Sequence, residues 1–88
     1  MVGEIVTCTC GREKGRAFFV VGREEQFLYL ADGKRRRLER PKRKKIKHTV
    51  PRGRFFHPST EKLENNEPLC NRDLRRALAA FRDQEMGR

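Results

Sequence analysis

A run of basic side chains in the middle of the chain has the composition of a phosphate-binding segment. Residues 34–47, KRRRLERPKRKKIK, contain ten Lys or Arg residues and a single acid, Glu39, so they carry +9 of the formal net charge of +10. The rest of the chain is close to neutral, with twelve basic and eleven acidic residues. A positive field this concentrated indicates a polyanionic partner, and nucleic acid is the first candidate. A solvated, disordered basic tail is the alternative, which the mid-chain position of the run disfavours.

A short glycine-bounded loop is the second segment that could hold phosphate. Residues 11–15 read GREKG, with Gly11 and Gly15 at the two ends. Glycine lets a loop turn tightly and lets its backbone approach a phosphate or sugar closely. Arg12, Lys14 and Arg16 add positive charge and hydrogen-bond donors beside it. We expect this loop to lie close to part of the basic run, because both belong to one small domain.

The elements that must position these residues are predicted to be short strands. Residues 5–9, 17–21 and 26–31 are rich in β-branched and aromatic side chains and are separated by polar turns. Asp32-Gly33 is a strong hairpin signal, so we expect residues 34–38 to fold back on residues 26–31.

The fourth strand is expected to end at Pro41, and residues 46–50 can form a fifth strand before Pro51. Several short strands with close turns predict a mainly β fold, a small barrel of about five strands spanning residues 1–50. Barrel closure would remove the exposed strand edges.

The C-terminal part of the chain is predicted to be helical. Residues 51–70 are expected to form an irregular connector with one helical turn at 59–63. Residues 71–86 then form an amphipathic helix packed on the barrel, with Asn71 as its N-cap and arginines facing outward. Its apolar stripe recurs at i, i+3, i+4 and i+7 and comprises Leu74, Ala77, Leu78 and Phe81.

The three cysteines and two histidines are not expected to hold a metal or to do chemistry. An odd number of cysteines indicates a reduced, intracellular protein, and core packing is the favoured role. The alternative is a zinc site built from Cys8, Cys10, Cys70 and either His48 or His57, although paired zinc cysteines are usually spaced more widely. No nucleophile–base pair or acid pair is visible, so we expect neither an enzyme, nor a cofactor, nor a small-molecule substrate.

The sequence predicts no membrane partner. The longest good apolar run, residues 17–21, is far too short to span a bilayer. The first residues, MVGEIV, lack the features of a signal peptide, so a cytoplasmic location is expected.

The motifs along residues 3–48 resemble those of one protein family. Residues 3–15 read G-x-I-V-x(4)-G-x-x-K-G, and residues 31–34 (ADGK), 36–38 (RRL), 41–42 (PK) and 47–48 (KH) follow in order. This pattern resembles small bacterial KOW-domain RNA-binding proteins, which are similar to large-subunit ribosomal proteins of the archaeal and eukaryotic type. Residues 71–78, NRDLRRAL, resemble them more loosely. The resemblance implies an SH3-like barrel that binds structured RNA, with ribosomal RNA and the large ribosomal subunit as candidate partners.

The sequence therefore predicts a non-enzymatic RNA-binding protein that works through phosphate contacts and shape recognition. RNA is favoured over DNA through the resemblance, since charge does not separate them. The predicted contact residues are Gly11, Arg12, Lys14, Gly15, Arg16, Lys34, Arg35, Arg36, Arg37, Arg40, Lys42, Arg43, Lys44, Lys45, Lys47 and His48.

The alternative function is a protein-interaction adaptor that docks an acidic partner in transcription or translation. An aromatic-lined groove would favour the adaptor, whereas basic residues gathered around the GREKG loop would favour RNA. The aromatic residues Phe18, Phe19, Phe27, Tyr29 and Phe81 are expected in the core. Phe55 and Phe56 could stack on RNA or cap the barrel end, and the sequence leaves this open.

Overall fold

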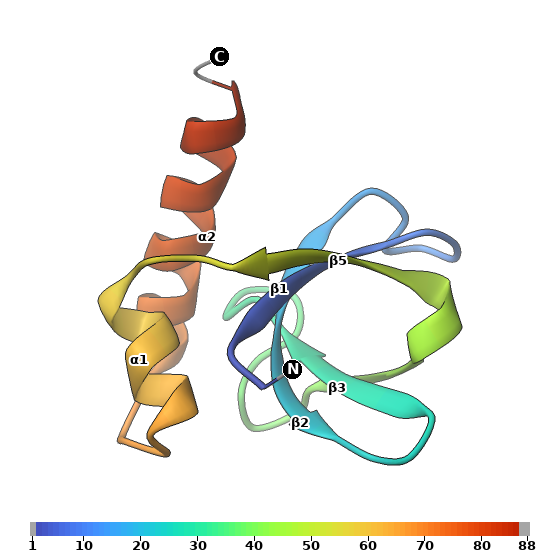
Figure 1. The fold of residues 1–88 in the computed structure, drawn as a ribbon, viewed down its shortest axis with the longest axis horizontal. Coiled ribbons are helices and arrows are strands. Elements are labelled where there is room, and N and C mark those ends of the chain that lie inside the picture. Colours follow the sequence, from blue (N-terminus) through green and yellow to red (C-terminus); the bar gives the residue numbers. More distant parts are fainter. Residues whose placement is uncertain (1, 87–88) are drawn as a thin grey trace.

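Five antiparallel strands and two helices make up the part of the chain that the computed structural model describes, residues 2–86 (Figure 1). Residue 1, where the barrel was expected to begin, and residues 87–88 lie outside the described residues. The elements in chain order are β1 (Glu4–Cys8), β2 (Ala17–Arg23), β3 (Phe27–Ala31), β4 (Lys42–Lys45), the 3₁₀ turn η1 (Ile46–His48), β5 (Thr49–Arg54), α1 (Pro58–Glu64) and α2 (Asn71–Met86). The predicted mainly β class with a C-terminal helix is confirmed.

The strands form one curled sheet in the order β4-β3-β2-β1-β5. This arrangement is consistent with the predicted SH3-like barrel, but the sheet is not closed, and β4 and β5 are its two edge strands. Pro51 does not end the fifth strand as expected. It lies within β5, opposite Val6 of β1 and beside an irregularity in the register, as proline can on an edge strand.

The fourth strand lies later in the chain than the sequence indicated. Residues 34–38 do not pair with β3. Instead β4 does, with Phe27 opposite Lys45 and Leu30 opposite Lys42, so Pro41 precedes the strand rather than ending it. Residues 34–38 and 42–45 are similarly basic, and neither offers an apolar alternation that would choose between them.

Two apolar clusters hold the sheet and the helix together. Val6, Cys8, Phe18, Val20, Leu28 and Leu30 fill the inside of the curl. Ile5, Phe19 and Ala31 pack from the sheet against α2, whose buried side chains are the predicted stripe Leu74, Ala77, Leu78 and Phe81. The stripe and the core roles of Phe18, Phe19 and Phe81 are confirmed.

Two aromatic residues expected in the core lie at the surface instead. Phe27 and Tyr29 are half-buried on the outer face of β3, because the period of two along a strand places them opposite the inward Leu28 and Leu30. The Arg43 guanidinium lies 3.5 Å from the centroid of the Phe27 ring. The Tyr29 hydroxyl donates a hydrogen bond to Glu24.

The segment between the sheet and α2 is more regular than the expected connector. Residues 51–70 contain the last residues of β5 and all of α1. His57 is the N-cap of α1, and its Nδ1 accepts a hydrogen bond from the backbone N–H of Ser59 (3.1 Å). Within residues 2–86, neither helix combines the length and the apolar character needed to cross a bilayer.

Candidate nucleic-acid interface

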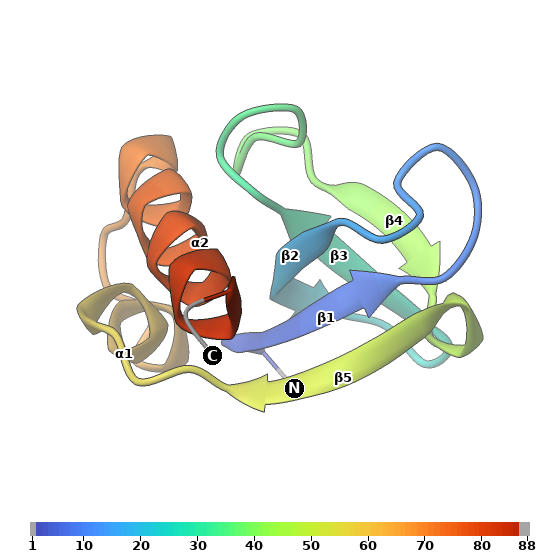
Figure 2. The ribbon, with the colours of Figure 1, turned by 90° about the horizontal axis from the view of Figure 1, so that it is seen from above.

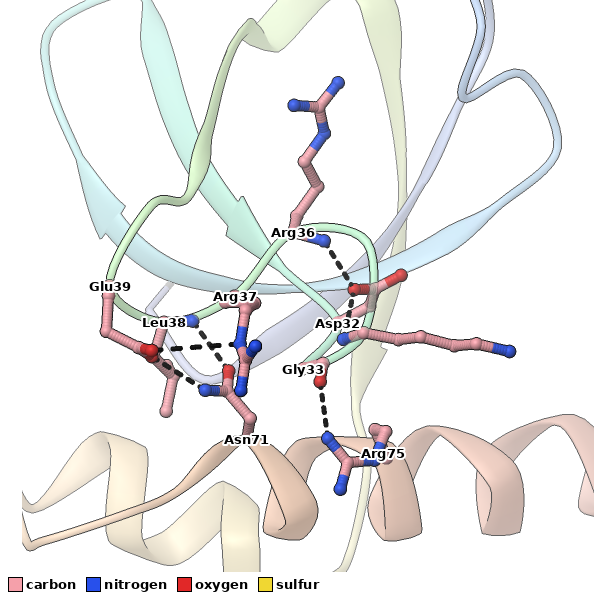
Figure 3. Close-up of polar contacts among 9 residues, drawn as sticks. Asp32, Gly33, Arg36, Arg37, Leu38, Glu39, Asn71 and Arg75 are labelled. Carbon is pink, nitrogen blue, oxygen red and sulfur yellow. Dashed lines mark hydrogen bonds and ion pairs between the residues drawn. The ribbon is translucent and has the colours of Figure 1, made fainter.

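The loop between β3 and β4 is folded on itself by Asp32 and docked on the first turns of α2 (Figure 3). Asp32 Oδ1 accepts hydrogen bonds from the backbone N–H groups of Lys34 and Arg36, both 2.9 Å. Gly33 has φ +78°, and a Cβ at this position would overlap the carbonyl oxygen of Asn71. Arg75 Nη1 donates to the Gly33 carbonyl oxygen (2.7 Å). Only glycine allows this close approach, which places the start of the basic run beside the helix.

Asn71 fixes the second half of the same loop. It is the first residue of α2 rather than its expected N-cap, and its side chain faces the loop. Its Oδ1 accepts from the Leu38 backbone N–H (2.8 Å), and its Nδ2 donates to Glu39 Oε1 (2.7 Å). The Asn71 hydrogen bond holds the pKa of the Glu39 carboxyl below its usual value.

Asp73, rather than Asn71, accepts hydrogen bonds at the start of α2. Asp73 Oδ2 accepts a hydrogen bond from the Cys70 backbone N–H (3.1 Å) and another from the Cys70 thiol. These bonds lower the pKa of Asp73.

The glycine-bounded loop and the basic run meet at Glu13. Glu13 Oε2 accepts a hydrogen bond from Arg36 Nη2 at 2.6 Å, and Lys44 Nζ lies 3.7 Å from Glu13 Oε1 and 3.0 Å from the Cys10 carbonyl oxygen. The side chains of Glu13 and Lys44 are only 11% and 9% exposed. The hydrogen bond from Arg36 and the nearby positive charges lower the pKa of Glu13. The expected proximity of the two basic segments is thus observed, and one buried acid holds them together.

A basic groove lies between α2 and the sheet, where these loops converge. It has a volume of about 650 Å³, and its floor contains Thr7 and Ala17 of the sheet. Its basic residues come from three elements: Arg16 beside the GREKG loop, Lys34 and Arg35 of the docked loop, and Arg75 and Arg82 of α2. Two acids, Asp32 and Glu85, also line the groove. Asp32 already accepts the two backbone hydrogen bonds of the loop turn.

The predicted contact residues divide into four groups. Gly15, Arg16, Lys34 and Arg35 line the basic groove, and Gly11, Arg12 and Lys14 lie on the exposed glycine-bounded loop. Arg36, Arg43 and Lys44 are paired with Glu13 or Glu24. The remaining residues, Arg37, Arg40, Lys42, Lys45, Lys47 and His48, lie along the loop, β4 and η1 and do not line the groove.

Two basic residues of the groove, Arg75 and Arg82, were absent from the predicted contact set. Arg75 and Arg82 are seven residues apart, so they lie on one face of α2, beside the buried stripe. The sequence placed them outward but gave no sign of what faced them. That information comes from the docking of the loop at Gly33, which depends on tertiary contacts.

The cysteines occupy three different environments. Cys8 is buried, Cys10 is half-buried and Cys70 is exposed, and burial raises the pKa of the Cys8 thiol. Among residues 2–86 no three His, Cys, Asp or Glu side chains gather as a metal site.

The chain matches no protein-family model and no curated protein.

The Gly33 contact gives a stability prediction with an internal control. Gly33→Ala should destabilise the protein by roughly 2–4 kcal/mol, because it adds a steric overlap with Asn71 to the strain of positive φ. Gly15→Ala should cost only about 1–2 kcal/mol, since Gly15 has φ +83° but open space at the Cβ position. Urea unfolding of both variants measures the difference. Equal stability of the two would show that the close contact is not a constraint.

Glu13 gives a pH prediction. Its pKa is lower in the folded protein than in the unfolded chain, so its stabilising effect is present above the unfolded value and is lost as the pH falls through the folded value. Glu13→Gln should therefore be less stable by about 1–3 kcal/mol at neutral pH. It should also lose less stability than the parent between about pH 5 and pH 3.

The matched control is Glu25→Gln, which changes an exposed acid of the same type. Urea midpoints measured across this pH range separate the cases. A Glu13→Gln protein that follows the parent curve would exclude the buried ion cluster as a link between the loops.

Proposed function

We propose that the protein is a non-enzymatic RNA-binding module that holds structured RNA through phosphate contacts in the basic groove. The observation that carries this proposal is the convergence of Arg16, Lys34, Arg35, Arg75 and Arg82 on one groove. Within residues 2–86 none of these five side chains has a carboxylate partner within ion-pair distance. Their charge is therefore available to phosphate groups.

Groove shape supports recognition of a folded RNA rather than of a base sequence. The cationic side chains come from separate elements held together at Gly33, Asn71 and Glu13, so the backbone segments that carry them are in place before binding. Phosphate contacts from such a frame position a backbone without reading its bases. The resemblance to KOW-domain proteins supports RNA over DNA, with ribosomal RNA and the large ribosomal subunit as the proposed partners in the cytoplasm.

The structure contains both patterns that were expected to separate RNA from the adaptor alternative. An aromatic-lined groove, which favours the adaptor, lies at Phe55, Phe56 and Phe81. Basic residues beside the GREKG loop, which favour RNA, are Arg16, Lys34 and Arg35, and RNA is preferred because the charge in the basic groove is the larger feature. The His57 ring accepts a backbone hydrogen bond at the start of α1, which is a structural role.

A charge-matched pair of variants tests the proposal. The groove variant is Arg16→Ala, Lys34→Ala and Arg35→Ala, and the control is Arg23→Ala, Arg72→Ala and Arg76→Ala. Each removes three exposed positive charges, but the control residues do not line the groove. The affinity for a structured ribosomal RNA fragment is measured as a function of salt concentration.

The groove variant should bind more weakly, and the slope of log K against log salt should fall in magnitude by about 2 to 3, one phosphate contact for each side chain removed. The control should keep most of the parent slope. Equal losses in the two variants would mean that only net charge matters. Should both retain RNA affinity but lose an acidic protein partner, the adaptor function is correct.

A further inference from the structure

A second groove, around the exposed ring of Phe56, adjoins the basic groove. Phe56 is 87% exposed, whereas the other exposed large apolar residues, Val2 and Val50, are 39% and 44% exposed. The groove has a volume of about 760 Å³ and is lined by Arg52, Arg54, Phe55, Phe56, Phe81, Gln84 and Glu85. An aromatic ring this open is available to stack on a flat partner.

The protein holds Phe56 on a fixed support. Its neighbour Phe55 packs inward, with its ring edge-on to Phe81 (centroids 5.5 Å apart) and stacked on His57 (5.8 Å). Arg54 lies over the Phe56 ring, 5.2 Å from its centroid, and is itself oriented by two hydrogen bonds to Glu64 (2.7 and 2.9 Å). The residues on either side of Phe56 are therefore held in place, and the Arg54 guanidinium faces its exposed ring.

The charge of this surface differs from that of the basic groove. Arg52 is paired with Glu85, and Arg54 is paired with Glu64. Their positive charge is thus largely balanced, and phosphate attraction is not the main interaction that the surface offers. What remains is stacking on Phe56 and Arg54, together with the amide of Gln84.

The two grooves are adjacent and share part of their lining. Phe81 and Glu85 of α2 line both, and Figure 2 shows the β3–β4 loop on one side of α2 and β5 leading to α1 on the other. The ion pair with Arg52 neutralises Glu85, the acid that stands between the grooves. An RNA backbone bound in the basic groove can therefore continue past it without meeting an uncompensated negative charge.

We propose that Phe56 stacks on an unpaired RNA base that follows a helical stem held in the basic groove. This rests on the proposed RNA-binding function and names its substrate class, a stem with an adjoining single strand. The base must be unpaired, because the faces of paired bases are covered by their neighbours in the helix, whereas single-stranded bases stack on exposed aromatic side chains.

The test uses two RNA probes and three variants. The probes are a blunt-ended RNA duplex of two strands, which has no unpaired base, and the same duplex with a single-stranded oligoadenylate extension. Phe56→Ala removes the ring, Phe56→Trp keeps an aromatic surface, and Val50→Ala is the control for losing exposed apolar area from the neighbouring strand. Thermal melts confirm folding, which Phe56→Ala should retain because the ring is exposed.

Phe56→Ala should lower the affinity for the extended duplex about tenfold and leave the affinity for the blunt duplex unchanged. Its salt slope should equal that of the parent, since no phosphate contact is lost. Phe56→Trp and Val50→Ala should bind like the parent. The chain itself contains no tryptophan, so the fluorescence of the Phe56→Trp variant should be quenched by the extended duplex and not by the blunt duplex.

The outcomes separate the two proposals. A parent protein that binds neither probe contradicts the RNA-binding function itself. If the parent binds both probes and Phe56→Ala binds them equally well, RNA binding stands and stacking on Phe56 is wrong. A parent dimer that Phe56→Ala converts to a monomer would also overturn the stacking proposal, because a second copy would then cover the ring.

Discussion

The close packing of Gly33 against the first turn of α2 is the constraint on which the rest of the site depends. Because a side chain at this position would overlap the Asn71 carbonyl, the β3–β4 loop can dock on the helix only if residue 33 is glycine. The hydrogen bonds from Arg75 to Gly33 and between Asn71 and the loop then fix its course. The docked loop brings Lys34 and Arg35 into the same groove as Arg82, and without the loop the groove would lose both of these basic residues.

Charge balance decides which basic residues remain available to a ligand. Glu13 forms ion pairs with Arg36 and Lys44, and Glu24 forms an ion pair with Arg43 beside Phe27. The pair with Glu13 lets Lys44 be buried, because a buried positive charge is costly unless it is paired. Arg36 and Arg43 are more open, with 34% and 51% of their side chains exposed. The result is a segment whose inner charges hold the loops together, while the outer charges face solvent or the groove.

The sequence predicted the strand count, the helix and its apolar stripe, because hydrophobic periodicity reports on burial. The sequence-based prediction misplaced the fourth strand, since residues 34–38 and 42–45 are both strongly basic. The Asp32-Gly33 turn signal also could not show that Gly33 contacts the helix. The sequence-based prediction also missed Arg75 and Arg82 as groove residues and placed Phe27 and Tyr29 in the core. For the fourth strand and the two arginines, the deciding interaction joins segments distant in sequence, which local patterns do not reveal. For Phe27 and Tyr29 the alternation with Leu28 and Leu30 along β3 was a local signal of their outward position.

Amide chemical-shift mapping by NMR during titration with a structured ribosomal RNA fragment tests the central claim most directly. The account predicts that the largest changes fall together on Gly15 and Arg16, on Lys34 and Arg35, and on residues 75–85 of α2. Changes confined to residues 42–47, with α2 unaffected, would contradict it. Binding would then be a property of the basic edge strand alone, and the groove would have no part in it.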